Sequence, residues 1–138
     1  MSKSLNSLQP WGAFFLRLVL GCAMIYHGYS KVIPSTGHNI FSAMQHHTHV
    51  VASLGLPYWL GYVSALTEFI GGILILLGFF TRFAAFMISV NMLVALIAVD
   101  AHRGYPASEY PLALLAIALM LFFYGAGVLA LDRKIGFS

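Results

Sequence analysis

Long, uninterrupted runs of apolar residues dominate the pattern of the chain. Four such runs cover residues 11–29, 58–80, 83–100 and 109–130. Each is close to the roughly 20 residues that a helix needs to cross the hydrocarbon core of a bilayer. The runs lack the two-residue alternation of membrane β-strands, so they predict helices. The pattern therefore predicts an all-α, polytopic membrane protein, folded as an antiparallel four-helix transmembrane bundle.

The connections between the runs add one further element. The turn from Gly78 to Arg82 is very short, so the second and third helices must be antiparallel neighbours. The first connection, 31–56, is long, and its residues 39–54 contain neither Pro nor Gly. Apolar and small residues recur there at helical spacing, which predicts a short amphipathic surface helix in the first outer loop. The residues on that face are Phe41, Met44, Thr48, Val51 and Ala52. An irregular loop is the alternative.

Composition strengthens the membrane prediction. The 138 residues are 60% hydrophobic and 8% charged, whereas about 25% of residues are charged in a typical soluble domain. A chain of this length predicts a single domain, 1–138. The net charge of +3 comes from scattered side chains. Because there is no basic run, nothing indicates a nucleic-acid partner. The single cysteine, Cys22, excludes an internal disulfide and a cysteine-based metal site.

Lysine and arginine residues predict the orientation. An even number of spans places both termini on one side of the membrane. That side carries four basic residues, and the other side carries Lys31 and Arg103. We therefore expect both termini in the cytoplasm. The four basic residues are Lys3, Arg82, Arg133 and Lys134. Arg17 interrupts the first apolar run and no cleavage signal follows, so we expect that run to be a retained anchor.

Glu68 stands near the middle of the second apolar run. A carboxylate at bilayer depth costs about 2.5–3.5 kcal/mol on insertion scales. Glu68 shares one helical face with small residues, which let neighbouring helices approach closely. These small residues are Gly61, Ser64, Ala65, Gly71 and Gly72. Glu68 is therefore expected to point into the bundle, where it needs a polar partner. Arg17 of the first run is the best partner, and Asn91 of the third could supply an amide.

Arg17, Glu68 and Asn91 thus form a predicted intramembrane polar network with two interpretations. The network could fix helix packing, provided that every polar group is satisfied. It could instead be a proton site, or a contact to a small polar or redox ligand, because ionisable groups inside membranes are usually functional. The sequence leaves both interpretations open.

Histidines form a second pattern at the predicted outer interface. His27 lies four residues before Lys31 on one helix face, and the two could line an outer cavity. His46 and His49 have a spacing that can share a metal. No further ligands follow at a fixed spacing, so these two stay weak candidates and no metal site is predicted. Solvated histidines at headgroups or against a partner protein are the alternative. We find no nucleotide-binding, hydrolase, haem, flavin or iron–sulfur motif, and predict no catalytic residue.

Several stretches resemble the DoxX-like family of small four-helix membrane proteins. "LRLVLGCAMIYHGYSKV" (16–32) looks like the family's first helix, and "GLP" (55–57) opens the second. "TEFIGGILILLGFFTRFAA" (67–85) is similar to its most characteristic stretch. "GAGVLALD" (125–132) resembles its ending, with Ala130 where a Ser is common. The matching positions are Arg17, His27, Gly28, Lys31, Glu68, Gly71, Gly72, Thr81, Arg82 and Asp132.

The resemblance implies a place in membrane oxidoreductase systems of the bacterial cytoplasmic membrane. Some members resemble the small subunit of a thiosulfate:quinone oxidoreductase, and others resemble proteins of methylamine utilisation or oxidative-stress complexes. The first hypothesis is thus a subunit of a larger redox complex that helps to form a quinone or lipid site and binds no cofactor alone. The second is a stand-alone, oligomeric binding or transport module that uses Arg17, Glu68 and Asn91. The third is a quinone-linked enzyme in its own right.

Overall fold

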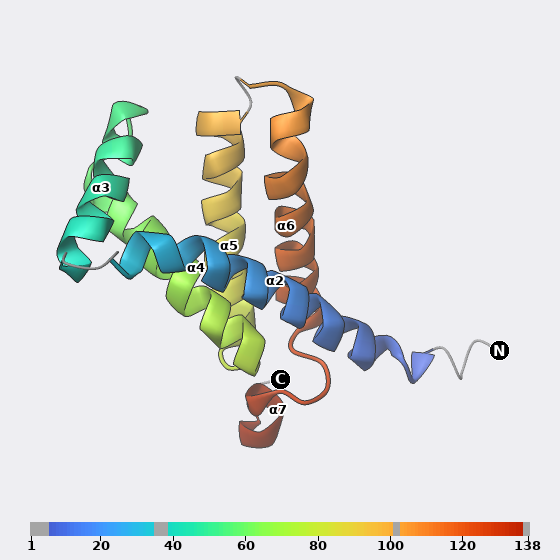
Figure 1. Ribbon diagram of the computed structural model, residues 1–138. Coiled ribbons are helices and arrows are strands. Elements are labelled where there is room, and N and C mark those ends of the chain that lie inside the picture. Colours follow the sequence, from blue (N-terminus) through green and yellow to red (C-terminus); the bar gives the residue numbers. More distant parts are fainter. Residues whose placement is uncertain (1–5, 35–38, 101–102, 137–138) are drawn as a thin grey trace.

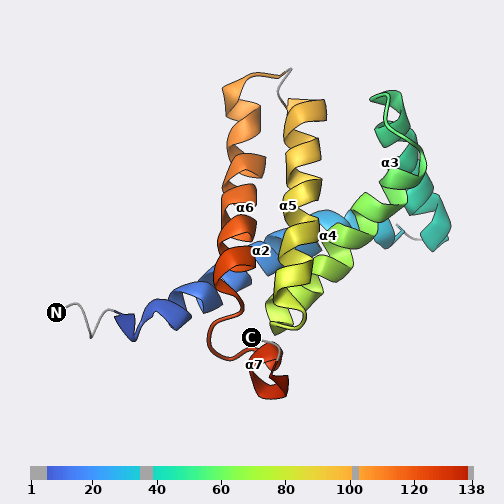
Figure 2. The same cartoon turned by 180° about the vertical axis from the view of Figure 1, so that it is seen from behind.

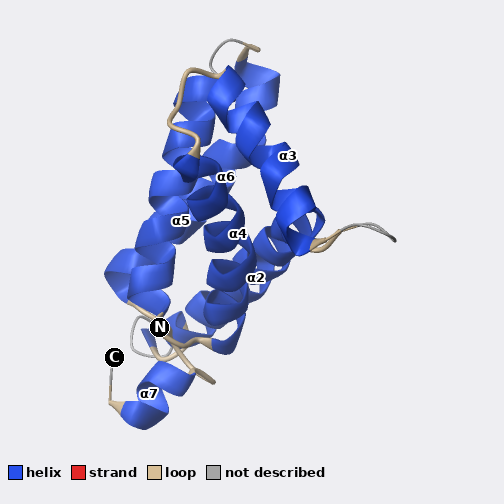
Figure 3. Ribbon diagram, turned by 90° about the vertical axis from the view of Figure 1, so that its left-hand side faces the viewer, coloured by secondary structure: helices blue, strands red, loops and turns tan. Residues whose placement is uncertain are grey.

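The computed structural model describes residues 6–34, 39–100 and 103–136, and the regular elements within them are all helices (Figures 1 and 3). Within these ranges, four helices are long and apolar enough to cross a membrane, which confirms the predicted fold class. They are α2 (Gln9–Val32), α4 (Trp59–Leu77), α5 (Thr81–Ala95) with its π-helical continuation η1 (Leu96–Asp100), and α6 (Tyr105–Tyr124). Two shorter helices are α3 (Ile40–Ser53) and α7 (Leu131–Ile135).

The spans pack mainly as two pairs, α2 with α4 and α5 with α6. Figures 1 and 2 show the first pair lying diagonally across the second. The short turn between α4 and α5 makes these two helices neighbours as predicted. In this turn Gly78 has a φ of +65° and Phe80 a φ of +48°, so the chain reverses through two left-handed residues. From this turn α4 and α5 diverge, and α3 lies beside α4 (Figure 1).

Glycines bring α2 and α4 into backbone contact. A Cβ atom at Gly28 would lie 2.5 Å from the backbone nitrogen of Phe69, and one at Gly72 would lie 2.8 Å from that of Ile25. Side chains larger than hydrogen would therefore force these helices apart. The predicted small-residue face of α4 does face the bundle, since five of its six members are buried and Ser64 is half-buried. The five are Gly61, Ala65, Glu68, Gly71 and Gly72.

The predicted helix in the first connection is α3. Three residues of its predicted inner face, Met44, Thr48 and Val51, are buried. Phe41, which was assigned to the same face, is 74% exposed. The face packs on protein, because a Cβ at Gly61 of α4 would lie 2.5 Å from the Cα of Thr48. α3 therefore belongs to the packed structure, a role that the prediction of a surface helix did not include.

The fourth span differs from its predicted bounds of 109–130. α6 begins earlier, with Pro106 in its first turn, where a missing N–H is tolerated. It ends at Tyr124. Gly125 and Gly127 follow with φ values of +98° and +72°, and these left-handed residues turn the chain into a loop. The apolar run of the sequence continues past these glycines to residue 130, but the helix ends before them.

Candidate functional site

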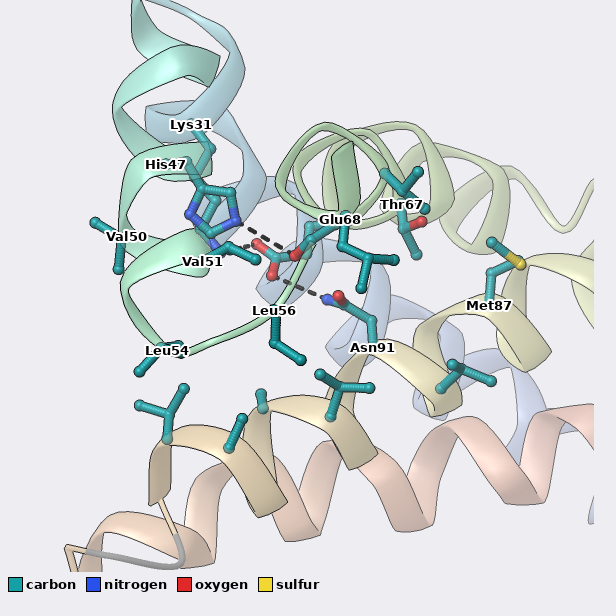
Figure 4. Close-up of a pocket in the computed structure, with 18 residues that line it drawn as sticks. Lys31, His47, Val50, Val51, Leu54, Leu56, Thr67, Glu68, Met87 and Asn91 are labelled. Carbon is teal, nitrogen blue, oxygen red and sulfur yellow. Dashed lines mark hydrogen bonds and ion pairs between the residues drawn. The ribbon is translucent and has the colours of Figure 1, made fainter. Parts of the chain in front are cut away.

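Glu68 is the centre of a polar cluster between α2, α4 and α5. Its side chain is buried. Lys31 Nζ, from the last turn of α2, donates to Oε2 at 2.6 Å, and Asn91 Nδ2, from α5, donates to Oε1 at 3.0 Å (Figure 4). The expected inward orientation of Glu68 and its contact with Asn91 are both present. Each carboxylate oxygen has a donor, so the buried charge is paired and hydrogen-bonded.

The predicted pairing of Arg17 with Glu68 is wrong. Gly28 lies against the backbone of Glu68 and Phe69, so antiparallel packing brings the Lys31 end of α2 to Glu68. Arg17 is 14 residues before Lys31, which places it about 21 Å away along the helix axis. The two predicted partners of Glu68 therefore separate, and Lys31 takes the position that was assigned to Arg17.

Arg17 instead satisfies backbone carbonyls at the other end of the bundle. Its guanidinium is buried and donates to five carbonyl oxygens at 2.8–3.2 Å. These belong to Ile75, Leu76, Ala126, Val128 and Leu129. The first two are carbonyls of the last turn of α4, where backbone donors run out, although Ile75 O also accepts from the backbone nitrogen of Gly78. The others lie in the loop after α6. Arg17 therefore joins three segments of the fold and is not part of the Glu68 cluster.

Asp132 lies at the same end of the bundle as Arg17. It is buried, and its carboxylate accepts hydrogen bonds from the backbone nitrogens of Phe80 at 2.7 Å and Thr81 at 2.8 Å. These are the first donors of α5, so Asp132 acts as its N-terminal cap from a distant part of the chain. In the sequence analysis Asp132 was only a position that matches the family, and no role was assigned to it. Arg17 and Asp132 are structural, and both lie away from the Glu68 cluster.

A cavity of about 210 Å³, here called the first cavity, opens between α3, α4 and α5. Figure 4 shows Lys31, His47, Glu68 and Asn91 gathered at one end of it. The remaining lining is almost entirely apolar, and includes Ala98 and Val99 of the π-helical segment. Several lining residues are themselves exposed on the outer surface of the spans, among them Val63, Val90 and Val94. In a membrane this mouth would face the lipid chains.

His47 is a cavity residue that the sequence analysis missed. Its Nε2 lies 3.4 Å from Ser64 Oγ. Burial, and next the positive charge of Lys31, lower the pKa of the imidazole to about 4. At neutral pH His47 is therefore uncharged, with one nitrogen that donates and one that accepts. The sequence could have predicted this position, because His47 is three residues after Met44 and four before Val51, a spacing that places it on the buried face of α3.

A second cavity, also of about 210 Å³, lies between α2, α5 and α6. It is lined by Lys31 and Glu68 and by the pair His27 and Tyr110. His27 Nε2 is 2.9 Å from the hydroxyl of Tyr110. The structure thus places His27 and Lys31 on one cavity, and the outer position of that cavity in the membrane stays a prediction.

The histidines considered for a metal are not brought together with further ligands. Among the described residues there is no group of three or more His, Cys, Asp and Glu side chains with suitable placement. His46 is exposed, and the ring of His49 packs edge-on to Tyr58 with centroids 5.5 Å apart.

Comparison with known proteins shows to which family the chain belongs. The sequence pattern of the DoxX family matches residues 12–101, a range that contains Arg17, Lys31, Glu68 and Asn91. The chain belongs to the DoxX family. A protein of Haemophilus influenzae, named "Uncharacterized protein", is 36% identical over 96% of both chains. A Bacillus subtilis protein named "Putative oxidoreductase CatD" is 30% identical over 93% of this chain and 90% of its own length. No solved structure matches.

This DoxX chain is therefore a multi-pass membrane protein with bacterial relatives, and its first cavity has a defined chemistry. The polar end offers an ammonium group, an amide and a neutral imidazole, all of which donate hydrogen bonds. The walls offer aliphatic surface. Such a cavity suits an amphiphile that has acceptor oxygens on a compact head and an apolar remainder.

Proposed function

We propose that this DoxX protein is a small integral membrane subunit of a larger redox complex, and that its first cavity helps to form a quinone site. The observation that carries the proposal is the cavity itself. Lys31, His47 and Asn91 supply donors at one end, and the mouth between α4 and α5 opens beside the residues that would face lipid. A quinone has carbonyl oxygens on a flat ring and an aliphatic tail, so it matches both ends.

The redox part of the proposal draws on a relative. The Bacillus subtilis protein carries the name of an oxidoreductase, and it aligns with 93% of this chain. The Glu68 cluster supplies hydrogen-bond donors and charge, but these groups do not carry electrons themselves. We therefore assign electron transfer to a partner protein, and assign to this chain the binding and orientation of the quinone head.

Direct binding tests the cavity. The full-length protein in lipid nanodiscs is irradiated with an azido-quinone, and the labelled peptides are mapped with and without excess decylubiquinone. We expect competed label on α3, α4 or α5 at the first cavity. Ala98→Trp, which fills that cavity, should reduce the competed label at least tenfold, whereas Leu119→Trp on the exposed face of α6 should not. Label that is spread evenly over the lipid-facing surface would contradict the proposal.

The partner would dock on the outer face of α6. Ala113 and Ala116 are exposed there, so these two small residues do not pack inside the chain's own bundle, whereas the half-buried Met120 packs partly against its core. Small residues allow close helix contact within lipid. Ala113→Trp combined with Ala116→Trp should abolish co-purification of redox partners after gentle detergent extraction. If the folded variant still brings down every partner, α6 is not the docking face.

A second candidate, a stand-alone oligomeric binding or transport module, is favoured by the second cavity. Arg17 cannot belong to its pathway, because its donors are engaged with backbone carbonyls. Native electrophoresis separates the two candidates. A large band that contains redox proteins supports the subunit, and a small band of this chain alone supports the module.

A further inference from the structure

The two cavities meet at the ion pair. Three residues, Lys31, Glu68 and Ala95, line both of them. The first cavity lies on the α3 side of the pair and is walled by aliphatic side chains. The second lies on the α6 side. The Lys31–Glu68 pair therefore separates the two cavities. The largely apolar first cavity lies on one side of the pair, and the second cavity lies on the other.

The second cavity has the character of a water-accessible vestibule. Its mouth includes Tyr110, which is 49% exposed, and the half-buried ring of His27, which is hydrogen-bonded to the tyrosine hydroxyl. Both groups donate and accept hydrogen bonds, as a chain of exchanging protons requires. The titratable groups around Lys31 are Glu68 from α4, His47 from α3, His27 from α2 and Tyr110 from α6. On the opposite side of the pair, the first cavity is lined mostly by aliphatic side chains and opens beside exposed residues of the spans, which would face lipid and not water.

We propose that the second cavity is a proton entrance to the ligand site, in which water passes His27 and Tyr110 to reach the Lys31–Glu68 pair. This rests on the proposed quinone site. Reduction of a quinone to a quinol takes two electrons and two protons, and the electrons come from a reduced flavin of the partner protein. For each proton, an N–H bond of Lys31 breaks as an O–H bond forms on the quinone. A proton from the aqueous phase, relayed by the vestibule water, then returns the amine to its ammonium form, so no hydroxide is left behind and Glu68 stays a carboxylate.

Chemical accessibility tests the entrance without any quinone. Ala95→Cys in a Cys22→Ser background places a thiol where the cavities meet. The probe is a charged, membrane-impermeant methanethiosulfonate reagent, applied to the protein in nanodiscs. We expect measurable modification, slowed at least tenfold by Ala107→Trp, which fills only the second cavity. The matched Ala98→Trp, which fills only the first, should leave the rate unchanged. If Ala98→Trp slows the reaction and Ala107→Trp does not, or if the thiol never reacts, the entrance is refuted.

Size-exclusion profiles report whether the variants fold, and Ala107→Leu serves as a smaller plug if the tryptophan is not tolerated. A second measurement follows protons directly. A bound hydroxynaphthoquinone changes its visible absorbance when it is protonated, so a stopped-flow pH jump gives the rate. Ala107→Trp or Ala107→Leu should slow this relaxation at least tenfold with binding unchanged, and an unchanged rate would overturn the proposal. Failure of the hydroxynaphthoquinone to bind would count against the quinone site alone, since thiol accessibility still decides the water route.

Discussion

The charge on Glu68 is held by two donors with different roles. Lys31 neutralises the carboxylate, and Asn91 provides only a neutral hydrogen bond. Removing the cation from a buried pair leaves an uncompensated charge, which costs about 3–5 kcal/mol. We therefore expect Lys31→Met to lower the unfolding temperature in detergent more than Glu68→Gln, whose amide oxygen still accepts from Asn91. The double variant Lys31→Met with Glu68→Gln should recover part of the loss. Equal damage from both single variants, without recovery, would contradict this account.

The structural role of Arg17 depends on the forked shape of its guanidinium. Its fork of donors reaches carbonyls on two segments at once, and a lysine ammonium has a single nitrogen. Arg17→Lys should therefore destabilise the protein nearly as much as Arg17→Met, by on the order of 3 kcal/mol or more, because several buried carbonyls lose a charged donor. Thermal unfolding in detergent measures both variants. Near wild-type stability of Arg17→Lys would show that charge alone suffices.

His47 predicts a pH dependence of stability. Its pKa is lowered to about 4 in the folded protein from an ordinary value of 6.5. Between these two values the unfolded chain binds the extra proton, so stability falls as the pH decreases from about 6.5 toward 4. His47→Gln removes this titration. We expect the unfolding temperature of wild type to drop more steeply over this pH window than that of the variant. Parallel curves would mean that His47 is not buried as described.

The contact between α2 and α4 depends on glycine at the crossing. Ala at Gly28 would bring its Cβ within 2.5 Å of a backbone nitrogen, and backbone cannot move aside as a side chain can. Gly28→Ala should therefore destabilise the protein and also disturb the Lys31–Glu68 pair three residues away. Gly12, on the same helix, has nothing within 4 Å of such a Cβ and provides the control. Thermal unfolding compares the two, and equal effects would exclude helix crossing as the cause.

The cap on α5 is a separate, smaller contribution. Asp132→Ala leaves the backbone donors of Phe80 and Thr81 without their acceptor. Loss of an N-terminal cap costs about 0.5–2 kcal/mol. Arg133→Ala, at an exposed neighbouring position, should have little effect. Chemical unfolding in mixed micelles can compare the two, and a large loss from Arg133→Ala would contradict this assignment.

At the scale of single helices the sequence predicts the structure well, because the length of an apolar run and the helical spacing of residues are local properties. The four spans and α3 follow from them. The partners of Glu68 do not, because they depend on how far α2 slides along α4. The position of α2 along α4 is set by the close contacts of Gly28 and Gly72. These contacts join residues that are far apart in the sequence. Lys31 was therefore expected only to line an outer cavity with His27, and Arg17 was paired with the wrong segment. His47 was missed because the face of α3 was read from its apolar members.

For the whole molecule, the orientation in the membrane remains a prediction. It rests on the basic residues, of which Lys3 lies outside the described residues. In a Cys22→Ser background, His46→Cys on α3 and Lys134→Cys on α7 both place a thiol at an exposed position. With termini in the cytoplasm, an impermeant maleimide added to intact cells should label His46→Cys and spare Lys134→Cys. The reverse pattern would invert the topology.

The contacts of Arg17 also set an order of events during synthesis. The arginine enters the membrane with the first span, but one of its acceptors, Ala126, lies 109 residues later in the chain. At about 5–20 residues per second, a ribosome needs roughly 5–20 s to produce that acceptor. Ile75 and Leu76 can satisfy part of the guanidinium earlier, but throughout this interval its Nη1 lacks the acceptors Ala126 and Val128. A chain that stops after α6 would keep that defect permanently, so we expect the short tail beyond the last span to complete the fold of the first.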